Sequence, residues 1–495
     1  MVIQQNADVP VWGQADPGES IKVELSGRYA VTTGPKKGTT LSYKRISQVT
    51  AGKDGKWTIR MRTAAAGGPL KLQIQCEKNR IDIEDVMVGE VWICSGQSNM
   101  AMTVSRSLNA EQETESANHP GIRMFTTARQ ASVKPQENCK GDWKVCSPQT
   151  VSAFSATAYF FGRQLHAELG VPIGLINSSW GGTAVEAWTS MPAQKNIAKL
   201  EPVFAPWKSG DDPARYKAAM DRYQKALDAW KKKATDAKKA KKKAPRKPRA
   251  PVKMSENQNY PANLFNGMIN PMIPYRIRGA IWYQGERNSN KGEISVLYGL
   301  QLTTLIKDWR TRWDQGAFPF LFVQLPNFKV VQTQPVEESG WSNVREGMQE
   351  TLAIENTGMA ITLDAGDAND IHPKNKQVVG SRLARWALAT SYGKKGIVYS
   401  GPIYKSMEKR GDSIVVHFDH AEGLRAKGGE LQGFAIRGKD GEYVWADARV
   451  EGETVVVSSA KVKKPVAVRY AWAMNPIGNL LNAAKIPASP FRTDR

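Results

Sequence analysis

The sequence predicts a mixed α/β protein in which a three-layer α/β/α unit is flanked by strand-rich segments at both ends. Near both ends, apolar and polar residues alternate with a period of two between Gly, Pro and Asp turns, which is typical of β-sandwiches. In the middle, apolar strands alternate with amphipathic helical stretches, a pattern that predicts a parallel sheet covered by helices on both faces. A chain of 495 residues also exceeds the size of one ordinary hydrophobic core.

The predicted N-terminal sandwich segment covers residues 1–85. Its short apolar runs include VPVWG, IKVEL, TIRM and LKLQIQ, separated by the turn sequences DPGE and KDGK. The predicted C-terminal β-rich domain covers residues 393–495, with the alternating runs SIVVHF, GFAIRG, EYVWADARV, TVVVSS and VAVRYAW. We expect these two ends to form accessory sandwich structure around the central unit.

The central unit is predicted to span residues 86–392. Its apolar strands are VGEVWICSG, VPIGLINSS, RGAIWYQG and FPFLFVQL, and FSATAYFFGRQLHAEL has the pattern of an amphipathic helix. In parallel sheets of this kind, ligands bind beyond the carboxyl ends of the strands. The residues that follow these strands are therefore the candidates for a functional site.

Residues 208–253, which we call the basic arm, interrupt this unit. They contain 17 Lys or Arg against five Asp, and so carry about half of the formal net charge of +22. Helical spacing of apolar residues predicts a helix with a packing face, which then gives way to a Lys- and Pro-rich end. Because a block of like charge repels itself, we expect a solvated, partly disordered insertion; the alternative is an anionic partner such as an acidic polysaccharide or nucleic acid.

The remaining composition limits the possible classes of protein. No apolar run approaches the length of a membrane span, and the N-terminal residues show neither the basic nor the apolar region of a secretory signal. The four cysteines form no C-x-x-C pair and there are only five histidines, so we expect no metal and no cofactor. Cys139 and Cys146 lie in a polar stretch and could form a disulfide if the protein is exported.

A serine and a histidine stand out as a candidate catalytic pair. Ser98 lies in a Gly-containing turn directly after the strand VGEVWICSG, where a hydroxyl and free backbone N–H groups suit acyl transfer. His372 follows the apolar strand GMAITL, and Asp370, two residues earlier, can orient an imidazole. The alternatives are that Ser98 caps the following helix and that His372 belongs to an acidic surface loop.

Two further segments end apolar strands at the same edge of the predicted sheet. In SSWGGT, the glycines around Gly182 allow backbone N–H groups to approach an oxyanion. In WYQGE, Gln284 brings a side-chain amide to this edge. A nucleophile, a base and oxyanion donors are thus all represented.

The ordered motifs GQSNM, SSWGGT, WYQGE and DIHP resemble the sialate O-acetylesterase branch of the SGNH hydrolases, which also contains acetyl xylan esterases. The resemblance extends from VPVWGQADPGE near the start to PASPFRTD near the end. It implies a flavodoxin-like SGNH domain, a catalytic set of Ser98, His372 and Asp370, and Asp367 as the alternative acid. It further implies an oxyanion hole of the Ser98 and Gly182 backbone N–H groups and the Gln284 amide, with Glu286 holding Gln284 or neighbouring backbone.

The function expected from this resemblance is a serine esterase that removes O-acetyl groups from sugars. An acetyl xylan esterase and a non-catalytic glycan- or polyanion-binding protein are the alternatives. The expected partner is an O-acetylated carbohydrate rather than a nucleic acid or a membrane, and the resemblance implies a secreted, periplasmic or cell-surface location.

Overall fold

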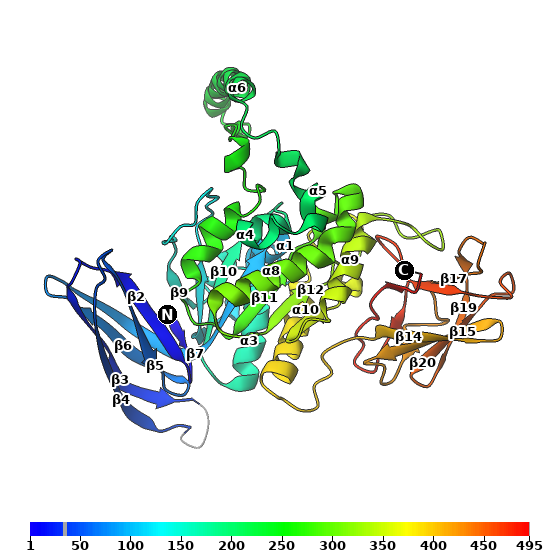
Figure 1. The fold of residues 1–495 in the computed structure, drawn as a ribbon, viewed down its shortest axis with the longest axis horizontal. Coiled ribbons are helices and arrows are strands. Elements are labelled where there is room, and N and C mark those ends of the chain that lie inside the picture. The colour runs from blue at the N-terminus through cyan, green and yellow to red at the C-terminus, as the bar shows by residue number, and fades with distance from the viewer. Residues whose placement is uncertain (33–36, 495) are drawn as a thin grey trace.

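A mainly parallel β-sheet occupies the centre of the computed structural model, which describes residues 1–32 and 37–494 (Figure 1). Its strand order is β13-β12-β11-β7-β10-β8-β9, and all neighbours pair in parallel except β8 and β9. The strands are β7 (Arg80–Gly96), β8 (His119–Thr126), β9 (Trp143–Cys146), β10 (Ile173–Ser179), β11 (Gly279–Tyr283), β12 (Phe320–Val323) and β13 (Thr357–Ala360). The parallel sheet predicted for the middle of the chain is therefore confirmed.

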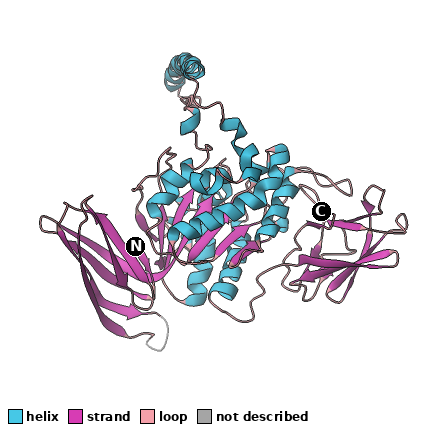
Figure 2. Cartoon of the chain, in the orientation of Figure 1, coloured by secondary structure: helices cyan, strands magenta, loops and turns pink. Residues whose placement is uncertain are grey.

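Helices cover both faces of this sheet, as Figure 2 shows. One face packs against α8 (Tyr298–Trp313) and α9 (Gly340–Thr351), and the other against α3 (Ala156–Leu169) and α10 (Lys376–Trp386). Alternate residues of β7 point to opposite faces: Ile93 joins the first hydrophobic cluster, and Trp92 joins the second. Burial on both faces explains why these strands are almost continuously apolar.

Strand β7 connects the central sheet with the N-terminal strands. Its first half pairs antiparallel with β6 (Gly67–Gln75), and its second half lies between β10 and β11. The other N-terminal strands are β1 (Val2–Gln4), β2 (Asp8–Gln14), β3 (Ser20–Val31), β4 (Thr40–Thr50) and β5 (Lys56–Arg62). In β5, buried and exposed residues alternate as the sequence predicts. Strand β4 was not predicted from the sequence, because it matches none of the apolar runs identified there.

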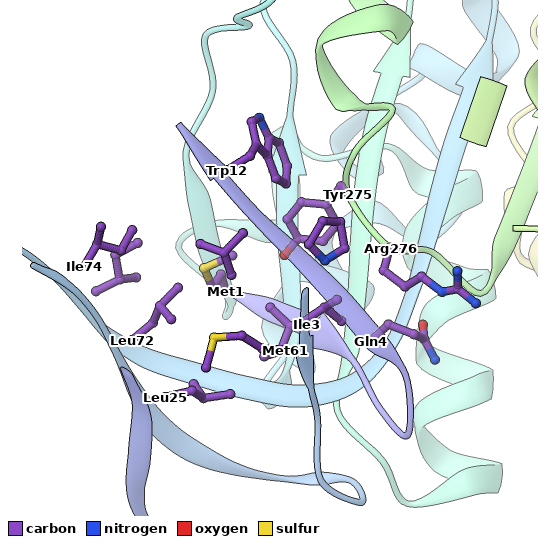
Figure 3. A pocket seen from close by; sticks show the side chains of 14 residues that line it. Met1, Ile3, Gln4, Trp12, Leu25, Met61, Leu72, Ile74, Tyr275 and Arg276 are labelled. Atoms are coloured by element: carbon purple, nitrogen blue, oxygen red, sulfur yellow. The ribbon is translucent and has the colours of Figure 1, made fainter. Parts of the chain in front are cut away.

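An apolar pocket of about 180 Å³ lies where the N-terminal strands meet the loop before β11. Figure 3 shows Met1, Trp12 and Met61 of the N-terminal segment near Tyr275, with Arg276 at the rim of the pocket. The Tyr275 hydroxyl donates a hydrogen bond to the Val2 carbonyl at 2.5 Å, and this contact ties the two parts of the chain together.

The C-terminal segment is likewise rich in strands around its own hydrophobic cluster. It contains two four-stranded sheets, β14-β15-β20-β19 and β18-β17-β21-β23, and the short pair β16-β22. Their bounds are β14 (Ile403–Arg410), β15 (Ser413–Asp419), β16 (Arg425–Ala426), β17 (Phe434–Arg437), β18 (Val444–Trp445), β19 (Asp447–Glu451), β20 (Thr454–Ser458), β21 (Ala467–Tyr470), β22 (Leu480–Leu481) and β23 (Phe491–Arg492).

Arg345 of α9 joins this segment to the central unit. Its buried guanidinium donates hydrogen bonds to the carbonyls of Leu325 and Pro326 in the central unit. It also donates to the carbonyls of Ala473 and Met474 in the C-terminal segment, all at 2.7–3.1 Å.

The basic arm contains a helix, α6 (Pro213–Lys239), that stands apart from the rest of the fold (Figure 1). A helix with an apolar packing face was predicted here. The residues of that face, Tyr216, Met220, Tyr223, Leu227 and Trp230, are half-buried, although no residue of α6 is fully buried. On this face, the Trp230 side chain donates a hydrogen bond to the Pro245 carbonyl at 2.8 Å, within the arm itself.

Three further findings concern the described residues. Within 1–32 and 37–494, no helix has the length and apolar content to cross a bilayer. Over the same ranges, no three His, Cys, Asp or Glu side chains gather as a metal site would require. All four cysteines are free, so the disulfide considered for Cys139 and Cys146 is not formed.

Candidate active site

The loops that follow β7, β10 and β11 meet at the carboxyl edge of the sheet. Gly96 ends β7 with a φ of +137°, and a Cβ at this position would lie 2.1 Å from the Tyr283 carbonyl oxygen. Only glycine allows this approach, after which the Gln97 N–H donates to the Tyr283 carbonyl at 2.9 Å. The Trp180 N–H donates to the Gly96 carbonyl at 3.0 Å. The turn that carries Ser98 is therefore held from both sides.

Ser98 is the first residue of the short helix α1 (Ser98–Ala101), whose N-cap is Gln97. A Cβ built on Gly181 would lie 3.2 Å from the Ser98 Cβ, so the SSWGGT loop directly adjoins the hydroxyl. Gly182 has a φ of +73°, which favours glycine. Among the acceptors of the described chain, neither the Ser98 nor the Gly182 N–H finds a hydrogen-bond partner. Two backbone donors beside the hydroxyl thus remain available to a ligand.

His372 lies in the loop between β13 and α10, with Asp370 beside it. The His372 Nδ1 is 3.6 Å from the Asp370 Oδ1, which also accepts the His372 backbone N–H at 2.9 Å. Asp367 instead accepts the backbone N–H of Asn369 at 2.8 Å, within its own loop. Asp370 is therefore the carboxylate nearer the ring, and the ring's other nitrogen, Nε2, is left for a further partner.

Partial burial sets the protonation state of His372. Desolvation lowers its pKa below the usual value of 6.5, while Asp370 opposes this shift. The imidazole is consequently neutral at neutral pH, as a proton acceptor must be. Within the described residues, no hydrogen bond joins His372 to the Ser98 hydroxyl; such bonds are often long without substrate and tighten in its complex.

A buried polar network connects the Ser98 turn with the His372 loop. The Asn99 Nδ2 donates to Glu286 Oε1 at 2.5 Å and to the Ile371 carbonyl at 3.0 Å. Lys376, the first residue of α10, donates from Nζ to Asn99 Oδ1 at 2.6 Å and to the Pro373 carbonyl at 2.7 Å. Asn99, which follows Ser98, is thus hydrogen-bonded to Ile371, which precedes His372.

The charged groups of this network are removed from water. Lys376 is fully buried, and desolvation lowers its pKa to about 7, although the nearby Glu286 acts in the opposite direction. Burial raises the pKa of the Glu286 carboxyl, whose Oε2 has no hydrogen-bond partner. The Lys376 ammonium also lies 5.3 Å from the centre of the Tyr283 ring, where a cation is attracted to the π-face.

The structure gives Glu286 and Gln284 different contacts from those expected. The Glu286 carboxylate accepts from Asn99 and does not hold the Gln284 side chain. The Gln284 Nε2, fully buried, already donates to Thr183 O at 3.0 Å and Asn288 Oδ1 at 2.7 Å, with Gln97 Oε1 at 3.2 Å. Since an amide nitrogen carries two hydrogens, both are used, and Gln284 connects the Ser98 turn with the SSWGGT loop.

A second buried carboxylate, Glu186, supports these groups from behind. It accepts from Asn288 Nδ2 at 3.1 Å and from Gln301 Nε2 at 3.2 Å, and it forms an ion pair with Lys291. The side-chain oxygen of Asn288 in turn accepts a hydrogen bond from the Gln284 amide, so Glu186 helps to fix Gln284 through Asn288.

Four residues of these networks, Asn99, Lys376, Asn288 and Glu186, were not singled out in the sequence. Asn99 lies within the motif GQSNM and Asn288 two residues after WYQGE, but Lys376 follows DIHP in a polar stretch that is typical of a surface. Of four tryptophans near the motifs, Trp188, Trp282 and Trp341 are fully buried in the core, and Trp180 is half-buried.

Comparison with protein families gives one clear match. The model of the family described as "carbohydrate esterase, sialic acid-specific acetylesterase" matches residues 88–236 and 253–389. These ranges include every candidate site residue and cover more than half of the chain.

Known proteins agree with this match. Sialate O-acetylesterases from Rattus norvegicus and Homo sapiens are 26% and 27% identical to this chain over 99% and 96% of its length, and over 92% and 86% of theirs. The crystal structure of a carbohydrate acetylesterase from Xanthomonas citri superimposes with a TM-score of 0.80 at 33% identity, covering 100% of this chain and 97% of that one.

Substitutions at Lys376 and Glu286 test how much the buried network stabilises the fold. Lys376→Met leaves the Asn99 Oδ1 and the Pro373 carbonyl without their buried donor and removes the positive charge near Glu286, so we expect a loss of about 1–3 kcal/mol in the free energy of unfolding. Adding Glu286→Gln removes the uncompensated charge. The double variant should therefore be more stable than the sum of the two single effects by about 1–3 kcal/mol.

Urea unfolding followed by circular dichroism measures these differences. Lys374→Met is the matched control, because Lys374 is exposed two residues away and should change the midpoint very little. Strictly additive single effects would show that Lys376 and Glu286 do not interact.

Proposed function

Because the chain belongs to the sialic acid-specific acetylesterase family of carbohydrate esterases, we propose that it removes O-acetyl groups from sugars with Ser98 as nucleophile and His372 as base. The family membership makes it a carboxylic ester hydrolase. The observation that carries the finer assignment is the position of Ser98, at the end of β7 beside two backbone N–H groups that have no partner in the described chain.

The proposed reaction has two steps. Ser98 Oγ attacks the acetyl carbonyl carbon while His372 Nε2 accepts the hydroxyl proton, and the Ser98 and Gly182 N–H groups stabilise the oxyanion. The C–O bond to the sugar then breaks, and His372 returns the proton to the sugar oxygen. Water, deprotonated by His372, then attacks the acetyl-enzyme, the bond between the acetyl carbon and Ser98 Oγ breaks, and His372 returns the proton to Ser98 Oγ as acetate leaves. Asp370 orients the ring and stabilises the imidazolium through Nδ1.

Gln284 enters this proposal mainly as a positioning residue. Its amide holds the Thr183 carbonyl next to Gly182, and it also contacts Gln97 next to Ser98. The expected role as third oxyanion donor requires one of these bonds to break as the oxyanion forms. Glu286 acts one step further away, through Asn99.

We propose an O-acetylated sugar as substrate because the relatives are sialate O-acetylesterases and a carbohydrate acetylesterase. Acetylated sialic acid and acetylated xylan are the two candidate substrates, and the location outside the cytoplasm is proposed from the family resemblance alone. A non-catalytic glycan-binding protein is the weaker alternative, since Ser98, His372 and Asp370 are all present.

Acetate release tests this proposal. A generic acetyl ester, an O-acetylated sialic acid and acetylated xylan are incubated with the wild type, Ser98→Ala and the control Ser95→Ala. We expect Ser98→Ala to lose acetate release and labelling by a fluorophosphonate probe while it keeps its fold. Ser95 lies three residues earlier with its Oγ buried and without a partner, so its variant should behave like wild type. Undiminished release by Ser98→Ala would exclude Ser98 as nucleophile.

The pH profile tests the assignment of Asp370. Because Asp370 raises the His372 pKa against the effect of burial, Asp370→Asn should lower that pKa further. The acid limb of kcat/KM should then move to lower pH, and its plateau should fall about 10²-fold or more, because the ring loses its orienting partner. The control Asp367→Asn should leave the limb in place. An unchanged limb in Asp370→Asn would argue against the pairing.

A further inference from the structure

The basic arm, residues 208–253, takes no part in the proposed reaction. The family match stops at residue 236 and resumes at 253, so the last residues of α6 and the return segment that follows it, residues 240–252, lie outside the match. No residue of α6 is fully buried, and its half-buried apolar residue Trp230 contacts the arm itself, so the helix adds little to the packing of the rest of the fold. We therefore expect the arm to have a function other than stabilising the fold.

Charge is concentrated at the far end of the arm. Residues 232–249 contain ten Lys or Arg and a single acidic residue, Asp236. Lys217 and Lys231 pair with aspartates of the arm, whereas none of those ten basic side chains forms an ion pair with a described carboxylate. Such a cluster is repulsive in isolation, and it is relieved when a polyanion replaces its counterions.

The return segment lies against the helix and keeps these charges together. Trp230 of α6 donates from its indole nitrogen to the Pro245 carbonyl at 2.8 Å, and the Lys247 ammonium lies 5.7 Å from the centre of its ring. Basic residues from both segments thus belong to one surface. The 27-residue helix is about 40 Å long, which suits a polymer better than a small anion.

The base of the arm is joined to the oxyanion loop. The Asn259 Nδ2 donates to the Gly182 carbonyl at 3.2 Å, and the Asn259 Oδ1 accepts the Ala184 N–H at 2.8 Å. Next to Asn259, the half-buried rings of Tyr260 and Trp207 lie 5.3 Å apart at the two ends of the arm. Their partly exposed faces offer apolar surface to a sugar ring.

We propose that the basic arm binds a carboxylated polysaccharide and holds it beside the Ser98 site. The repeated negative charges of such a polymer match the lysine cluster, and a polymer that runs from this cluster to the base of the arm reaches Asn259 and the oxyanion loop bonded to it. The choice of a polysaccharide over a nucleic acid rests on the proposed esterase function. The binding itself requires no catalysis, so the two can fail separately.

Binding is measured first, with fluorescent oligogalacturonate that carries no acetyl groups. In the test variant, Lys241, Lys242 and Lys243 are all changed to Gln, which should raise the Kd about tenfold at low salt. The same three positions changed to Arg should keep wild-type affinity. Gln at the exposed Lys461, Lys463 and Lys464 of the C-terminal segment removes equal charge elsewhere and should have little effect.

Turnover is measured next, with acetylated polygalacturonate and with 4-nitrophenyl acetate. The Gln variant of the arm should lose kcat/KM about fivefold or more on the polymer at low salt, and none on the small ester; the loss should disappear at high salt. Failure of every variant and the wild type on both esters would overturn the esterase function, while leaving the binding result to stand.

Three results would overturn the proposal for the arm. They are wild-type protein that does not bind oligogalacturonate, an equal loss in the C-terminal lysine control, and tighter binding of duplex DNA or phosphatidylglycerol vesicles at the same salt concentration. The third result would assign the arm to a different class of partner.

Discussion

The candidate site depends on one buried polar network, in which Asn99 lies between the Glu286 carboxylate and the Lys376 ammonium. Charged groups out of water are tolerated only when they have partners, and the partners here come from three loops far apart in the sequence. Asn99 follows the Ser98 turn, Glu286 follows β11, and Lys376 begins α10 behind His372. The same amide also donates to the Ile371 carbonyl, so the loop that carries the base is held against the turn that carries the nucleophile.

Much of the fold was predictable because burial leaves a periodic trace in a sequence. The continuous apolar runs of β7, β10 and β11 reflect burial on both faces, and the alternation in β5 reflects burial on one. Strand β4 gave no such signal, since it pairs only with β3 and most of its side chains are exposed or half-buried. In α6, helical spacing predicted a packing face whose residues are half-buried, but spacing alone does not show that the partner is another part of the arm, at Pro245.

The site was predictable to the extent that it follows strand ends. Ser98, Gly182 and Gln284 all lie just beyond the carboxyl ends of neighbouring parallel strands, which brings them to one edge of the sheet. What the sequence did not show is which groups touch. Lys376 has the sequence surroundings of a solvated lysine, yet its ammonium is buried and donates to Asn99 and to the Pro373 carbonyl. Likewise, the hydrogen bonds of the Gln284 amide depend on Thr183 and Asn288, whose positions are set by long-range packing.

Trapping the covalent acetyl-enzyme tests most directly whether Ser98 is the nucleophile. Wild-type protein is mixed with excess acetyl ester, quenched in acid during turnover, digested and analysed by peptide mass spectrometry. We expect an acetyl group on Ser98 that disappears once the substrate is exhausted. Acetate release without any such adduct, or with an adduct that forms and decays on a different residue, would contradict the assignment of Ser98 as nucleophile.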